Sequence, residues 1–108
     1  MHKIRTVRGI AAAGAAALAM LVASPSFAAN AKNGGELAKQ WCASCHVVSA
    51  DQKMATAGPP PFASIAKRPG FNAKAVAFFL LNPHPPMPNF SLTRSEANDL
   101  AAYIASLK

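Results

Sequence analysis

Hydrophobic residues recur at helical spacing in three segments of this chain, and no segment shows the alternation of apolar and polar residues that predicts a strand. The clearest segment is the last, LTRSEANDLAAYIASLK, in which Thr93 and Glu96 form a capping box at the start. Its C-terminal part is predicted to be an amphipathic helix. The apolar stripe of this helix contains Ala97, Leu100, Ala101, Ile104 and Leu107.

Two earlier segments also predict helices. In FNAKAVAFFLLNP, Asn72 is a good N-cap and Pro83 ends the helix, so the predicted helix spans residues 73–81. In NAKNGGELAKQW, a shorter helix is predicted to begin at an Asn33 cap and to run to Trp41. The apolar stripe of the 73–81 helix contains Val76, Phe78, Phe79, Leu80 and Leu81.

Proline-rich segments separate these helices. Residues 47–69 show no sustained periodicity, and the stretch NPHPPMPNFSL carries four prolines, which exclude a regular helix. Both segments are therefore predicted to be long, stiff loops. Loops of such length are unusual in a compact domain unless they wrap or cover something. Helices joined by loops, without strands, predict an all-α fold.

The first 28 of the 108 residues do not resemble part of a domain. They combine Lys3, Arg5 and Arg8 with an alanine-rich apolar run and a small residue at Ala28, which is typical of a cleaved secretory signal peptide. The apolar run is shorter than the roughly 20 residues of a transmembrane helix. We therefore expect cleavage after Ala28, a single domain over residues 29–108, a periplasmic location and no stable insertion in the membrane.

Charge excludes one class of partner. After loss of the signal peptide, eight Lys and Arg face four Asp and Glu, a net charge of +4. No run of basic residues is longer than Lys67-Arg68. Nucleic-acid binding would require a basic patch with interleaved aromatic residues, so it is not expected.

The sequence CASCH holds both cysteines of the protein, Cys42 and Cys45, and places His46 directly after them. Cys-x-x-Cys-His is typical of covalent haem attachment. Two thiols one short turn apart can each add to a vinyl group of the same haem edge, and the next residue then lies under the iron. His46 is therefore predicted to be the proximal iron ligand.

Two other interpretations of CASCH are weaker. A redox dithiol of a thiol-disulfide oxidoreductase would require a βαβ-type scaffold, which this short chain without strands does not predict. A zinc site would require a fourth ligand, and His84 is the only other histidine after residue 28.

The segments CASCH, GPPPFASIAKR and MPNFSLTRSEANDLAAYIASL together resemble a small class I c-type cytochrome. The resemblance covers nearly all of residues 33–108. It implies an all-α fold of three to four short helices wrapped around one haem c, which is attached through Cys42 and Cys45. It also implies that the helix of residues 33–41 crosses the C-terminal helix, with Gly34 facing Tyr103.

The same resemblance implies three further site residues. Met87 would be the distal iron ligand, and a thioether in that position raises the reduction potential relative to a second histidine. Pro60 would accept a hydrogen bond from the ring of His46, with Pro59 and Pro61 as competitors. Arg68, eight residues after Pro60, would bind a haem propionate.

Two expectations around the haem follow. His84 is an open alternative to Met87 and would give two histidine ligands and a lower potential. The aromatic residues are expected to be core, which in this family includes the lining of the haem: Phe71, Phe78 and Phe79.

The resemblance implies a monomeric electron carrier, not an enzyme, that passes single electrons between redox proteins with acidic docking surfaces. Exposed lysines around the haem edge would steer those partners. A haem-bearing subunit of a specific dehydrogenase or oxidase complex is the alternative. A gas or peroxide sensor would require that Met87 does not bind the iron.

Overall fold

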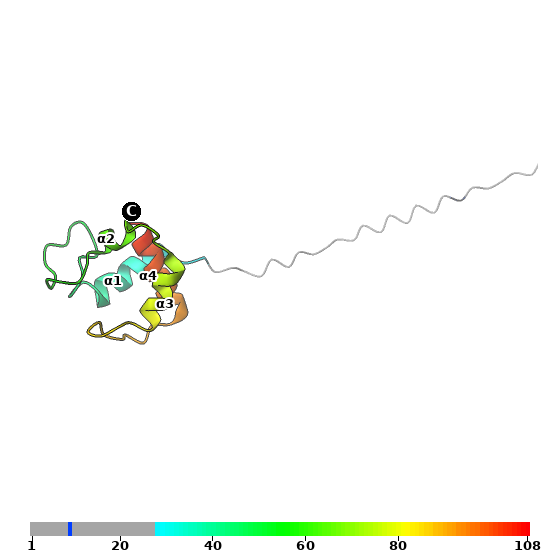
Figure 1. Cartoon of the computed structure of the whole chain (residues 1–108). Helices are drawn as coiled ribbons and strands as arrows, with labels where there is room; N and C mark the ends of the chain where they lie inside the picture. Colours follow the sequence, from blue (N-terminus) through cyan, green and yellow to red (C-terminus); the bar gives the residue numbers. More distant parts are fainter. Residues whose placement is uncertain (1–8, 10–27) are drawn as a thin grey trace, which may run out of the picture.

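The computed structural model describes Gly9 and residues 28–108, and within them it contains four α-helices and no β-strand (Figure 1). The predicted all-α fold is therefore confirmed for this part of the chain. The expected signal peptide lies outside the described residues except for Gly9 and Ala28. In chain order the helices are α1 (Ala31–Trp41), α2 (Phe62–Ala66), α3 (Ala73–Leu81) and α4 (Arg94–Ala105).

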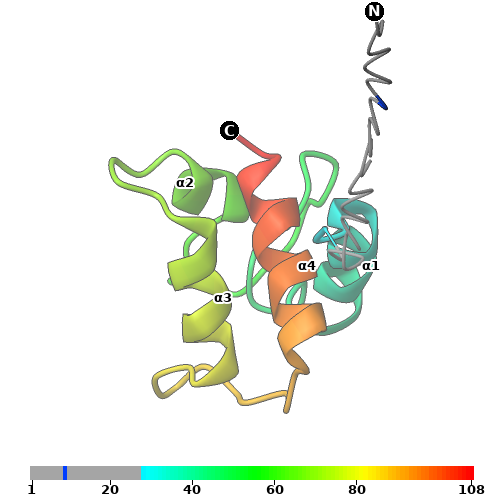
Figure 2. The same ribbon diagram turned by 90° about the vertical axis from the view of Figure 1, so that its right-hand side faces the viewer.

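Helix α4 is the centre of the fold. The other three helices each pack on α4, and Figure 2 shows α4 lying between α1 and α3. The predicted capping box is present, because Thr93 Oγ1 accepts a hydrogen bond from Glu96 N at 3.1 Å and Glu96 Oε1 accepts one from Thr93 N at 3.0 Å. The predicted stripe is buried at Ala97, Leu100, Ala101 and Ile104, and half-buried at Leu107.

The start of α1 differs from the prediction. Asn30, not Asn33, caps this helix, and its side chain accepts a hydrogen bond from Asn33 N at 3.0 Å. Asn33 instead donates from Nδ2 to Asp99 Oδ2 at 2.8 Å, while Asn30 N donates to Asp99 Oδ1 at 2.7 Å. A buried carboxylate of α4 therefore sets where α1 begins, which capping preferences alone could not show.

The crossing of α1 and α4 also differs in register from the expectation. Gly34 lies against the backbone of Asp99 and Leu100, so close that an added Cβ would lie 1.9 Å from Asp99 O. Gly35 faces Tyr103, because its added Cβ would lie 3.1 Å from the ring. Gly34 thus permits the approach of two helix backbones, and its neighbour Gly35 makes the contact with the aromatic residue.

Replacing Gly34 by alanine is expected to destabilise the protein by about 3 kcal/mol or more, because the methyl group overlaps backbone atoms that cannot rotate away. Gly35→Ala is the matched control, since the Tyr103 ring can shift by a few tenths of an ångström. Denaturant unfolding of the haem-loaded variants measures both. Equal losses of unfolding free energy in the two variants would contradict this account of the crossing.

Helix α2 was not predicted, because its five residues lie within the segment expected to be a loop. Helix α3 has the predicted bounds, and Asn72 Oδ1 caps it by accepting from Ala75 N at 3.1 Å. Of the three aromatic residues expected to be core or haem lining, Phe71 is half-buried against the core, whereas Phe78 and Phe79 are 74% and 39% exposed and are not buried by the polypeptide itself. Helix α3 packs on α4, and its buried residues are Ala77 and Leu80.

Candidate functional site

The CASCH segment forms a tight turn at the end of α1. Helical hydrogen bonding continues into Cys42, whose N donates to Ala38 O at 2.9 Å. The turn then closes on Cys42 O, which accepts from Cys45 N at 3.1 Å and from His46 N at 2.8 Å. Cys42 is buried, and Cys45 and His46 are half-buried. Local backbone bonding therefore gathers both thiols and the imidazole on one turn.

The ring of His46 is held in one orientation. Its Nδ1 lies 2.7 Å from Pro60 O, the carbonyl that the family register implies. A carbonyl oxygen can only accept, so Nδ1 carries the proton and Nε2 keeps the lone pair that binds a metal. The ring also contacts Phe62 at 5.2 Å between centroids. Phe62 N donates to Val47 O at 2.9 Å, which holds the start of α2 beside the attachment turn.

Met87 lies in the loop between α3 and α4 and is half-buried against the core. Its N donates to His84 O at 3.0 Å. Three residues later, the Phe90 ring stacks on Trp41 with centroids 6.0 Å apart and planes 6° apart. The stacking brings this loop to the end of α1, next to Cys42. Binding of iron by Met87 stays a prediction.

The two remaining candidates lie at the surface. His84 is exposed, with its Nδ1 2.8 Å from Pro85 O and its ring 5.3 Å from that of Phe79. Arg68 follows α2 and is exposed, and its backbone N donates to Ile65 O at 3.2 Å. Its predicted contact with a haem propionate stays a prediction.

Two residues that sequence reasoning missed support the turn. Gln52 bonds through its side chain to four backbone groups of residues 43–54. Tyr103 donates its hydroxyl proton to Val48 O at 2.5 Å and so ties this loop to α4. The only sequence signal for Gln52 was its place shortly after CASCH, and the sequence does not reveal which groups it bonds to.

The electrostatics of Cys42 disfavour thiol chemistry. The pKa of the Cys42 thiol is raised to about 11, mainly by burial and to a smaller extent by the charge of the neighbouring Cys45. A dithiol enzyme requires the opposite, a lowered pKa that supplies thiolate at neutral pH.

Among the residues that the structure describes, no three His, Cys, Asp or Glu side chains converge as a metal site. In the same part of the chain, no helix combines the length and the apolarity needed to cross a bilayer.

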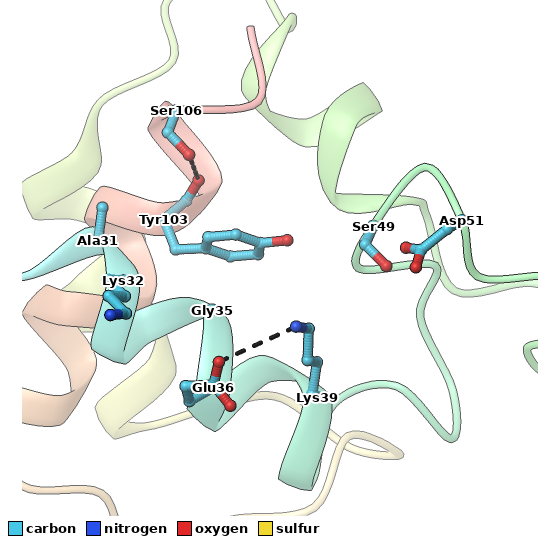
Figure 3. A pocket seen from close by; sticks show the side chains of 9 residues that line it. All are labelled: Ala31, Lys32, Gly35, Glu36, Lys39, Ser49, Asp51, Tyr103 and Ser106. Carbon is cyan, nitrogen blue, oxygen red and sulfur yellow. Dashed lines mark hydrogen bonds and ion pairs between the residues drawn. The ribbon is translucent and has the colours of Figure 1, made fainter.

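A surface depression of about 380 Å³ lies elsewhere, between α1, α4 and the loop at Ser49 and Asp51 (Figure 3). Charges of both signs line it, including the ion pair of Lys39 and Glu36 at 3.9 Å. Neither cysteine, His46 nor Met87 belongs to this depression.

The residues on the attachment turn fit haem c. Two thiols and an imidazole with a free Nε2 lie on one turn, which is the donor set that covalent attachment and proximal ligation require. Two exposed apolar rings lie beside the Met87 loop: Phe90, which belongs to this loop and is 37% exposed, and Phe79 of α3, which contacts His84 and is 39% exposed. Cys42, Cys45 and His46 are therefore the residues that would hold the group.

Comparison with known proteins agrees with this chemistry. The family model described as Cytochrome C oxidase, cbb3-type, subunit III matches residues 29–104. Cytochrome c-552 of Bradyrhizobium diazoefficiens is 56% identical over 94 residues, which cover 84% of this chain and 90% of that protein. No solved structure matches the chain. The chain therefore belongs to the class I c-type cytochromes, electron carriers that hold haem c covalently.

Proposed function

We propose that this chain is a periplasmic carrier of single electrons, with haem c attached through Cys42 and Cys45 and its iron bound by His46 and Met87. The observation that carries the proposal is the bond between His46 Nδ1 and Pro60 O, which leaves Nε2 as the ligand. Haem c supplies an iron that gains or loses one electron. Pro60 keeps the imidazole oriented in both oxidation states, so little of the protein reorganises and electron transfer is fast.

The proposed partners are redox proteins with acidic docking surfaces, which meet a monomer of this chain. Residues 29–108 carry a net charge of +4. The charge is distributed over several elements, because six exposed lysines lie on α1, on α3, in the loops and at the C-terminus: Lys32, Lys39, Lys53, Lys67, Lys74 and Lys108. Such a distribution steers acidic proteins toward the carrier without requiring a lasting complex. Neither a reaction on a small molecule nor nucleic-acid binding is part of the proposal.

The intact mass of the protein, purified from the periplasm and denatured, tests attachment and export together. We expect the mass of residues 29–108 plus one haem. A bare polypeptide mass, from a host with working haem-attachment machinery, would overturn the cytochrome function. A haem-loaded chain that retains residues 1–28 would overturn only the cleavage after Ala28.

Electron transfer to a small acidic redox protein is expected to slow about tenfold between roughly 0.01 and 0.15 M ionic strength, because salt screens the attraction to the lysines. Stopped-flow absorbance of the haem measures the rate. An uncharged small reductant is the control, and its rate should not depend on salt. A rate that rises with salt would point to a basic partner.

A second candidate function is a haem-bearing subunit of an oxidase complex, because the matching family model is described as a cbb3-type oxidase subunit. The relative named cytochrome c-552 favours the carrier, since the match covers 90% of that protein. Purification under mild detergent separates the two. Recovery in a fixed ratio with an oxidase would support the subunit, and recovery alone supports the carrier.

A further inference from the structure

We propose that Gln52 is a positioning residue for His46, because it holds the backbone of the attachment turn so that the imidazole keeps a single orientation. The inference rests on the proposed role of CASCH in holding haem. It adds a residue outside the motif to the machinery that presents the iron ligand.

The Gln52 amide contacts both ends of the turn. Its Nε2 lies 2.8 Å from Ala43 O and 2.8 Å from His46 O, and it also lies 2.9 Å from Met54 O. Its Oε1 accepts from Val48 N at 3.0 Å. Ala43 follows the first cysteine and His46 follows the second, so one side chain bonds to the residue directly after each thiol.

Chemistry fixes which way this amide points. Three of its four partners are carbonyl oxygens, which can only accept, and the fourth is a backbone N–H, which can only donate. Reversing the amide would place its oxygen against three carbonyls. The NH₂ group has two protons for the three carbonyl oxygens, so at least two of these oxygens share one proton.

The hydrogen bonds of Gln52 are connected to the core of the protein through Val48. Val48 is buried, and both its backbone N and its backbone O are hydrogen-bonded. Its N donates to Gln52 Oε1, and its O accepts from the hydroxyl of Tyr103 on α4. These bonds connect the turn to α4, the helix on which the rest of the fold packs.

His46 is consequently held at two points. Gln52 fixes its backbone carbonyl, and Pro60 O accepts from its ring Nδ1 at 2.7 Å. Both holding groups come from the segment between the turn and α2. If the backbone of His46 were free to rotate, the ring could keep its bond to Pro60 only part of the time. Gln52 therefore supports the contact that leaves Nε2 free for iron.

The test uses the reduced, haem-loaded protein and follows the exchange of the His46 Nδ1 proton with solvent by NMR. In Gln52→Met, which keeps the side-chain length and removes every hydrogen bond, we expect this exchange to be at least about tenfold faster. Thr93→Ala is the control, because it removes the α4 cap and lowers stability without touching the loop of residues 43–54. Equal exchange rates in the two variants would overturn the proposal.

A second measurement needs no variant and covers the case in which Gln52→Met does not accumulate. In the wild-type protein, the Gln52 side-chain NH₂ protons are expected to exchange at least about tenfold more slowly than those of the exposed Gln40. Equal exchange of the two amides would overturn the proposed role of Gln52. A wild-type protein without haem would instead overturn the proposed function, so the two failures are distinguishable.

Discussion

Replacing Cys42 and Cys45 together by alanine is expected to give a protein that loses all haem on denaturation. Without either thiol, no thioether bond can form on the turn, and His46 alone supplies only a reversible bond. The remaining chain of about 80 residues buries a small core, so we also expect a large loss of helical structure. Intact mass measures attachment, and far-ultraviolet circular dichroism measures helix content.

Ser44→Ala is the matched control for the double variant. Ser44 lies between the two cysteines and is exposed, and its side chain contributes only a 3.8 Å contact from Oγ to Cys45 Sγ. This control should retain one covalent haem per chain. A haem that stays on the double alanine variant through denaturation would show that another residue forms the covalent bond, and it would remove CASCH from the site.

The second large effect is expected from Met87→Ala, which should lower the reduction potential by on the order of 0.1–0.3 V, a fraction of the range that axial ligands span. A thioether favours ferrous iron, and its loss removes that preference. Spectroelectrochemistry of the purified protein measures the potential. The visible spectrum of the oxidised protein should change at the same time, because one axial position has lost its ligand.

His84→Ala is the control for this substitution, because His84 belongs to the same loop and its exposed ring contacts Phe79. If Met87 binds the iron, His84→Ala should leave the spectrum and the potential close to those of the wild type. The reverse pattern, a shift in His84→Ala and none in Met87→Ala, would assign two histidine ligands. A spectrum unchanged in both variants would remove both residues as ligands.

Local sequence signals were sufficient to predict α3 and α4. Asn72 and Thr93 cap α3 and α4 where predicted, because a cap bonds to backbone within three residues of itself. Helix α2 gave no such signal. It has no side-chain cap, and burial of Phe62 and Ala66 accompanies its formation. Helices this short are stable only when packed, so periodicity could not reveal it.

In the candidate site, too, some residues could be predicted from the local sequence and others could not. CASCH was readable because its three functional residues lie within one turn of chain. Pro60 required the family register, since three consecutive prolines offer nearly identical local environments. Gln52 was missed because its role exists only when the carbonyls of Ala43 and His46 are brought around it. A single side chain with four backbone partners has no pattern in the sequence.

The sequence alone determined the helical class of the fold, the capped ends of α3 and α4 and the chemistry of CASCH, because each depends on interactions within a few residues. Only the tertiary structure decided the α1 cap, the glycine that faces Tyr103, and the exposure of Phe78. These features depend on which groups of distant segments meet. Asp99 accepts a hydrogen bond from Asn30 N, the α4 backbone leaves no room for a side chain at residue 34, and α3 buries only Ala77 and Leu80.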